Sequence, residues 1–158
     1  MVSIPPEVQI KSSIKPGSVY YFPEKSFSSQ APYYFIVLNY SPLTDEVLLL
    51  VCSSSQIEKV RRRRRHLPIE TLVDIGNHEY SCFTVDSIVD CNNVFPKPID
   101  ELIRKRGLGE LDLKGEMAIE IVEKLRAGVL ASPLVNEELK DILTYSAVLP
   151  AIPPVSIA

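Results

Sequence analysis

The chain of 158 residues contains no tryptophan, two histidines, two methionines and three cysteines. No run reaches the roughly 18 apolar residues of a membrane-spanning helix, and residues 1–7 have neither the basic start nor the apolar core of a secretion signal. Cys52, Cys82 and Cys91 are odd in number and form no C-x-x-C pair, which argues against a disulfide framework and a zinc site. We therefore expect a cytoplasmic protein with reduced thiols, no membrane contact, and neither metal nor cofactor.

Motifs of the common enzyme classes are absent from the sequence. The chain contains no P-loop, no G-x-G-x-x-G fingerprint, no H-E-x-x-H motif and no G-x-S-x-G nucleophile elbow. Phosphoryl transfer, dinucleotide binding and the common hydrolase mechanisms therefore have no sequence support. A chain of this length buries about 70% of its unfolded surface, so we expect a single domain over residues 1–148, followed by a Pro-rich extended tail over 149–158.

The first half of the chain has the composition of β-strands. Short runs rich in Val, Ile, Leu, Tyr and Phe are each bounded by Pro, Gly, Ser or Asp. We expect strands over residues 18–22, 33–39, 46–53, 71–75 and 83–91, with a long polar loop over 24–32. Short strands joined in this way predict a small barrel, because closure leaves few exposed edges.

The second half of the chain has helical periodicity. Residues 98–106 begin with Pro, carry acidic residues early and basic residues late, and stop at Gly107, all of which agree with the helix dipole. A second helix is predicted over 113–127 and is expected to end at Gly128. Asn136 is a candidate N-cap for a last helix that extends to about residue 145. The fold class is therefore α+β, with two or three helices packed outside a small β-barrel of five or more strands.

Positive charge is concentrated in one segment of an otherwise slightly acidic chain, whose formal net charge is −3. Five consecutive arginines follow the third predicted strand: Arg61, Arg62, Arg63, Arg64 and Arg65. Like charges repel one another, so we expect this run to form a surface loop. Counterion release favours clustered cations on phosphate, and an acidic protein would favour them equally. The run therefore predicts either a polyanion site or an ordinary solvated loop.

Four segments of the chain follow one another in a recognisable order. They are residues 17–22 (GSVYYF), 33–39 (YYFIVLN), 50–56 (LVCSSSQ) and 81–90 (SCFTVDSIVD). In this order they resemble strands of the MazF/PemK family of toxin endoribonucleases, over roughly residues 14–127. The resemblance implies an SH3-like barrel, a homodimer, and RNA as substrate. It also implies an antitoxin whose acidic, partly disordered segment covers the basic groove.

The resemblance also implies which residues cleave RNA. The family's catalytic Thr or Ser at the end of the third strand matches Ser53, Ser54 or Ser55, whereas Tyr33 stands where the family has a catalytic arginine. Cleavage without a metal needs a base, an acid and cations around the phosphate. We expect the serines to face the scissile phosphate and His66 to be the acid/base group. The ordinary alternatives are hydroxyls that bond the backbone and a solvated histidine.

The residues expected to hold RNA are Lys59, the five arginines and Tyr33. Arginine clamps phosphate through two parallel hydrogen bonds, and a tyrosine ring stacks on an unpaired base. The leading hypothesis is a MazF/PemK-like protein that binds RNA and cleaves it without a metal. The alternative is a non-catalytic SH3-like barrel that binds nucleic acid, or an acidic protein, through the arginine run.

Overall fold

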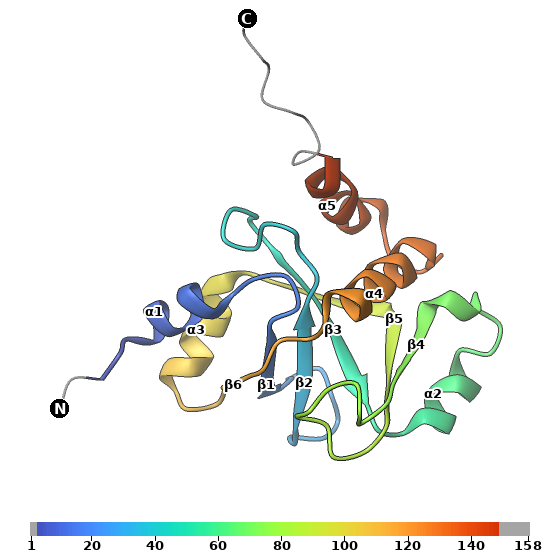
Figure 1. Ribbon diagram of the computed structural model, residues 1–158, viewed down its shortest axis with the longest axis horizontal. Coiled ribbons are helices and arrows are strands. Elements are labelled where there is room, and N and C mark those ends of the chain that lie inside the picture. The colour runs from blue at the N-terminus through green and yellow to red at the C-terminus, as the bar shows by residue number, and fades with distance from the viewer. Residues whose placement is uncertain (1–2, 149–158) are drawn as a thin grey trace, which may run out of the picture.

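The computed structural model describes residues 3–148, which form an α+β fold of five α-helices and one six-stranded antiparallel sheet (Figure 1). The ends of the chain, residues 1–2 and 149–158, lie outside this description, and so does the predicted tail. Each helix within residues 3–148 is too short or too polar to cross a membrane.

The bounds of the elements follow the chain order. The strands are β1 (Val19–Pro23), β2 (Pro32–Val37), β3 (Leu48–Ser54), β4 (Leu72–Ile75), β5 (Ser87–Lys97) and β6 (Asp112–Lys114). The helices are α1 (Pro6–Ser13), α2 (Ile57–Arg63), α3 (Ile99–Gly107), α4 (Ile119–Ala131) and α5 (Glu137–Val148), with a 3₁₀ turn, η1 (Ile69–Thr71).

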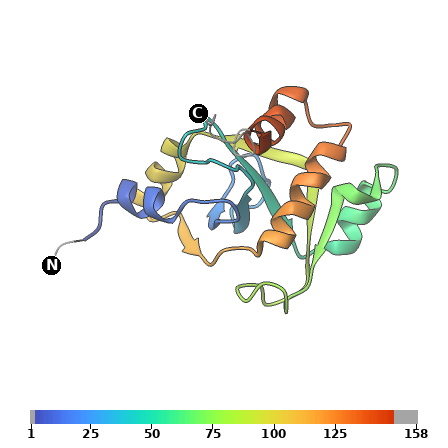
Figure 2. The same ribbon diagram turned by 45° about the horizontal axis from the view of Figure 1, so that its top comes forward.

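The strand order of the sheet is β4-β5-β3-β2-β1-β6. Strands β1, β2 and β3 form a meander, β5 pairs with β3, and β6 returns to pair with β1. The predicted closed barrel is not present, because β4 and β6 form the two edges of the sheet and do not pair with each other. The physical reason is that β6 ends at Lys114, after which the chain leaves the edge and enters α4, which covers one face of the sheet (Figure 2).

Two hydrophobic cores lie on opposite faces of the sheet. Side chains such as Val19, Ile36 and Val51 point to the face that α4 covers, where they meet Val122 and Leu125. The alternate residues of the same strands point to the other core, which α1 and α3 cover side by side (Figure 1). Because both faces of the sheet are buried, the strands have nearly continuous apolar sequences. Such runs could be recognised as strands from the sequence alone.

The predicted strands agree with β1 to β4 within a few residues, but the predicted strand over 83–91 is misplaced. Strand β5 begins at Ser87 and continues to Lys97. Phe83 is buried in a turn, where its amide donates to the carbonyl of Tyr80. The polar residues after Cys91 hid the rest of the strand, because they belong to a bulge: Val51 pairs with Val94, whereas Ser53 pairs with Val89.

Two helix predictions are confirmed and one is corrected. Helix α3 begins and ends within one residue of its predicted bounds, and the Asn136 Oδ1 atom accepts a hydrogen bond from the Leu139 amide at 2.9 Å, as an N-cap does. The helix predicted over 113–127 begins only at Ile119, because residues 112–114 pair with β1. It also continues past Gly128, which is buried against Cys91 rather than ending the helix.

The arginine run forms the predicted surface loop only in part, because Arg64 and Arg65 alone lie outside a helix, in a turn. Helix α2 includes its first three arginines and ends at Arg63, and α1 at the start of the chain was not predicted at all. Arginine is a good helix former, and Val60 anchors α2 through a buried side chain. Ion pairs from Arg61 to Asp74 and from Arg64 to Asp90 reduce the repulsion within the run.

Candidate functional site

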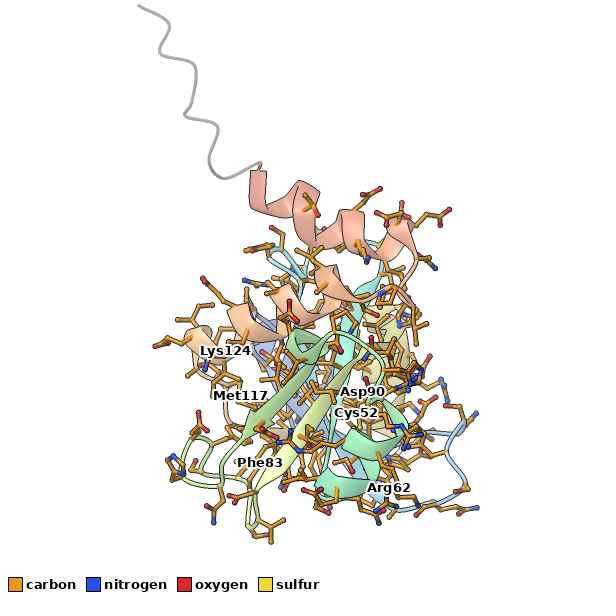
Figure 3. The ribbon with its side chains drawn as sticks, turned by 90° about the vertical axis from the view of Figure 1, so that its right-hand side faces the viewer. Cys52, Arg62, Phe83, Asp90, Met117 and Lys124 are labelled. Atoms are coloured by element: carbon orange, nitrogen blue, oxygen red, sulfur yellow. The ribbon has the colours of Figure 1, made fainter. Side chains whose placement is uncertain are left out.

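A groove of about 800 Å³ lies at the end of the sheet where β3 finishes and β2 begins. Its walls come from the ends of β1, β2 and β3, from residues 26–29, from α2, from residues 83–85 and from β5. In Figure 3 the labelled residues Cys52, Phe83 and Asp90 belong to this wall. Six of the residues predicted from the sequence line it: Tyr33, Ser53, Ser54, Ser55, Lys59 and Arg63.

The three serines at the end of β3 have different surroundings. Ser53 is only 5% exposed, Ser54 is half-buried and Ser55 is exposed. The Ser54 Oγ atom accepts a hydrogen bond from the Gln56 amide at 3.1 Å, which is the ordinary role of a hydroxyl at a strand end. Within residues 3–148 the hydroxyls of Ser53 and Ser55 form no hydrogen bond, so these two are available to a ligand in the groove.

Aromatic rings flank the serine end of β3. The Tyr34 ring lies 4.4 Å from the Tyr21 ring and 5.1 Å from the Phe83 ring, measured between centroids. Its hydroxyl donates to the Cys82 carbonyl at 3.1 Å. The Tyr33 ring is held edge-on by Phe27, with 5.0 Å between centroids. These contacts fix the orientation of both tyrosines, which are half-buried and line the groove.

The cations are divided between the groove and the surface beyond it. Lys59 is exposed, lines the groove and forms no ion pair within the described residues. Of the five arginines, all within the described residues, Arg63 alone lines the groove. Successive residues of a helix point in directions about 100° apart, so the three arginines within α2 cannot all face one ligand. Arg62, labelled in Figure 3, Arg65 and His66 are exposed and do not line the groove.

The Asp90 carboxylate contacts two arginines and therefore determines how much of their positive charge remains available to a ligand. Its Oδ2 atom accepts a hydrogen bond from Arg64 Nε at 2.8 Å and lies 3.8 Å from Arg63 Nη2. Its Oδ1 atom accepts from the Asn92 amide and from Asn92 Nδ2, at 3.1 and 2.9 Å. The Asn92 side chain also contacts Thr71 and accepts a hydrogen bond from Ser132. Asp90 is therefore held rigidly, with Arg64 as its principal partner.

Residues 26–29 form one wall of the groove, and the loop that carries them is attached to the fold at Glu24. The Glu24 Oε1 atom lies 2.8 Å from Lys97 Nζ, and Lys97 also bonds Glu101 at 3.0 Å. Burial opposes the charge on Lys97, but the hydrogen bonds to the two carboxylates outweigh it and raise the pKa of Lys97. Phe27 adds a contact with Phe95. The wall is thus a positioned part of the structure.

Acid and base groups are scarce in the groove. Burial raises the pKa of the Cys52 thiol to about 12, so this thiol is neutral at physiological pH. Burial also raises the pKa of Tyr34. Among the described residues that line the groove there is no histidine, and the Asp90 carboxylate is bonded to Arg64. The arrangement is suited to binding an anionic, partly aromatic ligand more than to transferring protons.

Sequence reasoning missed Asp90 as a groove residue, Arg63 as the single arginine that lines the groove, and the wall at residues 26–29. One feature of the sequence did indicate the groove: the predicted strand that ends in serines is followed closely by basic residues.

Comparison of this chain with models of known protein families and with curated proteins finds no match. The resemblance to the MazF/PemK family therefore stays a prediction from the order of motifs.

Proposed function

We propose that this protein binds single-stranded RNA in the groove at the end of β3. The observation that carries this proposal is the convergence, on one groove, of free hydroxyls (Ser53 and Ser55), cations (Lys59 and Arg63) and half-buried tyrosine rings. Cations hold the phosphates of a single strand, and aromatic faces stack on its unpaired bases. Bases within a duplex cannot reach such rings, so an unpaired strand is favoured.

An acidic protein is a weaker candidate for the same groove. Such a partner would need clustered free cations, but Arg61 and Arg64 already form ion pairs within the fold. It would also leave the tyrosine rings without a matching surface. In the toxin interpretation, an acidic antitoxin segment would compete with RNA for Lys59 and Arg63 rather than for the whole arginine run.

Cleavage of the bound RNA without a metal is a second candidate function, which the free Ser53 hydroxyl at the end of β3 favours. It lacks a partner for proton transfer, because His66 does not line the groove and Tyr33 replaces the family's arginine. The MazF/PemK relationship, a homodimer and a cytoplasmic location belong to the same proposal. The pairing of β6 with β1 supports the family relationship, because a late strand that pairs with the first strand is also a feature of an SH3-like barrel.

The test uses a mixed-sequence, end-labelled RNA in excess EDTA, with retained complex and fragments measured at several salt concentrations. We expect the double variant Lys59→Ala/Arg63→Ala to lower affinity by roughly 5- to 150-fold, because it removes two contacts from exposed side chains, at about 0.5–1.5 kcal/mol each. The slope of log affinity against log salt should fall by about 1.4, at about 0.7 per phosphate contact.

The matched control is Arg62→Ala/Arg65→Ala, which removes the same charge outside the groove. If both double variants weaken binding equally, RNA is held by general charge and the groove is not the site. If the unmodified chain retains no RNA at low salt, the proposed function is wrong. Fragments that disappear in Ser53→Ala would establish the cleavage function.

A further inference from the structure

Tyr33 and Tyr34 are neighbours in β2, yet they belong to opposite faces of the sheet. Tyr34 packs against the core under α4, and Tyr33 packs against the core under α1 and α3. Both nevertheless line the same groove. The groove therefore bends around the end of the sheet and has one tyrosine on each side of it.

The serine end of β3 lies between the two tyrosines. Phe35 of β2 pairs with Cys52 of β3, and this antiparallel register brings the residues after Cys52 beside Tyr34 and Tyr33. Side chains of paired residues point to the same face. Ser53 is thus on the Tyr34 side and Ser54 on the Tyr33 side, while Ser55 continues beyond the strand. Lys59 and Arg63 reach the same groove from α2.

Each tyrosine is supported by a second ring. Tyr34 lies against Tyr21, whose own ring carries the Lys114 ammonium 5.2 Å from its centroid. Tyr33 lies against Phe27. Successive side chains of a strand point to opposite faces of the sheet, so the backbone of β2 lies between the two tyrosine rings. Two bases stacked on each other are only about 3.4 Å apart. A stacked pair of bases therefore cannot contact both tyrosines.

We propose that the groove binds one dinucleotide step of single-stranded RNA with its two bases splayed apart. One base lies against Tyr34 and the other against Tyr33, and the phosphate between them is bound at the end of β3 by the Ser55 hydroxyl, Lys59 and Arg63. This inference rests on the proposed function and makes it specific, because it names the length and conformation of the RNA that the site recognises.

The test is calorimetric titration of the full chain with uridine monophosphate, UpU, UpUpU and a long oligouridine. Binding should tighten sharply from the monophosphate to UpU and only slightly beyond it. Tyr33→Leu and Tyr34→Leu should each weaken UpU binding by roughly 5- to 150-fold, the loss expected for one stacked base. Tyr33→Phe and Tyr34→Phe keep the rings and should recover most of the affinity that the leucine variants lose.

Circular dichroism of bound ApA provides a readout that a merely structural role of the tyrosines would not change. The couplet produced by stacked adenines should disappear when ApA binds and should persist with Tyr34→Leu. If ApA stays stacked in the complex, if UpU binds no better than the monophosphate, or if only one tyrosine matters, the splayed arrangement is wrong. If long oligouridine also fails to bind, the proposed function fails with it; if long RNA binds normally, only this inference fails.

Discussion

Replacement of Asp90 by asparagine tests whether this carboxylate holds arginine charge away from the groove. The Asp90 side chain is 11% exposed and its principal partner, Arg64, is 22% exposed, so water screens their ion pair only partly. Asparagine keeps the shape of the side chain, and its Oδ1 atom can still accept the hydrogen bonds from Asn92. The substitution therefore removes mainly one charge and the charge-assisted bond to Arg64.

The magnitude follows from that single bond. A hydrogen bond to a charged group contributes about 1.5–3 kcal/mol, so we expect Asp90→Asn to lower the free energy of unfolding by about 2 kcal/mol. The second contact, to Arg63 at 3.8 Å, adds little because the arginine side chain is 54% exposed. RNA affinity should rise, because Arg63 and Arg64 lose the anion beside the groove. One additional phosphate contact would increase the slope of log affinity against log salt by about 0.7.

Urea denaturation and RNA binding at several salt concentrations measure the two effects separately. The control is Asp74→Asn, which releases Arg61 from an exposed ion pair that does not line the groove. This control should change stability by less than about 0.5 kcal/mol, as surface substitutions usually do, and should leave the salt dependence as it was. The reasoning is refuted if Asp90→Asn binds RNA no more tightly than the unmodified chain, or if the two aspartates prove equivalent.

Two further predictions concern packing and thiol reactivity. Gly128→Ala should lower stability by about 1–3 kcal/mol through overpacking, because the added Cβ would lie 2.8 Å from Cys91 Sγ and from the Glu70 carbonyl. Gly107→Ala, whose Cβ would meet only Pro6 at 3.5 Å, should stabilise by up to about 1 kcal/mol; urea denaturation compares the two, and a stabilised Gly128→Ala would contradict the packing of α4. Iodoacetamide should modify Cys82 first near neutral pH, because a backbone hydrogen bond from Gly115 lowers the pKa of this thiol, whereas burial raises the pKa of Cys52 and Cys91. Peptide mass mapping across a pH series checks this, with Cys82→Ser as control, and equal rates at all three thiols would contradict it.

Local patterns predicted much of the fold. The apolar runs of β1 to β4, the dipole-matched charges of α3 and the Asn136 cap are properties of neighbouring residues, and the structure agrees with them. The predictions that were wrong concern contacts between residues that are distant in the sequence. Whether β6 would close a barrel, and where β5 would bulge, depend on strands that are distant in the sequence. Gly128 looked like a helix stop, but only the position of Cys91 shows that it is a close-packing site.

The sequence by itself determined the chemistry that reaches the groove: a serine-ended strand, a pair of adjacent tyrosines and a block of cations. Alternation along a strand, a local property, already placed Tyr33 and Tyr34 on opposite faces. Only the tertiary structure decided which arginines keep their charge for a ligand. The partners of Arg61 and Arg64 are Asp74 and Asp90, which are 13 and 26 residues away. Ion pairing over such separations depends on where α2 lies relative to β4, which carries Asp74, and β5, which carries Asp90. No pattern of neighbouring residues encodes those contacts.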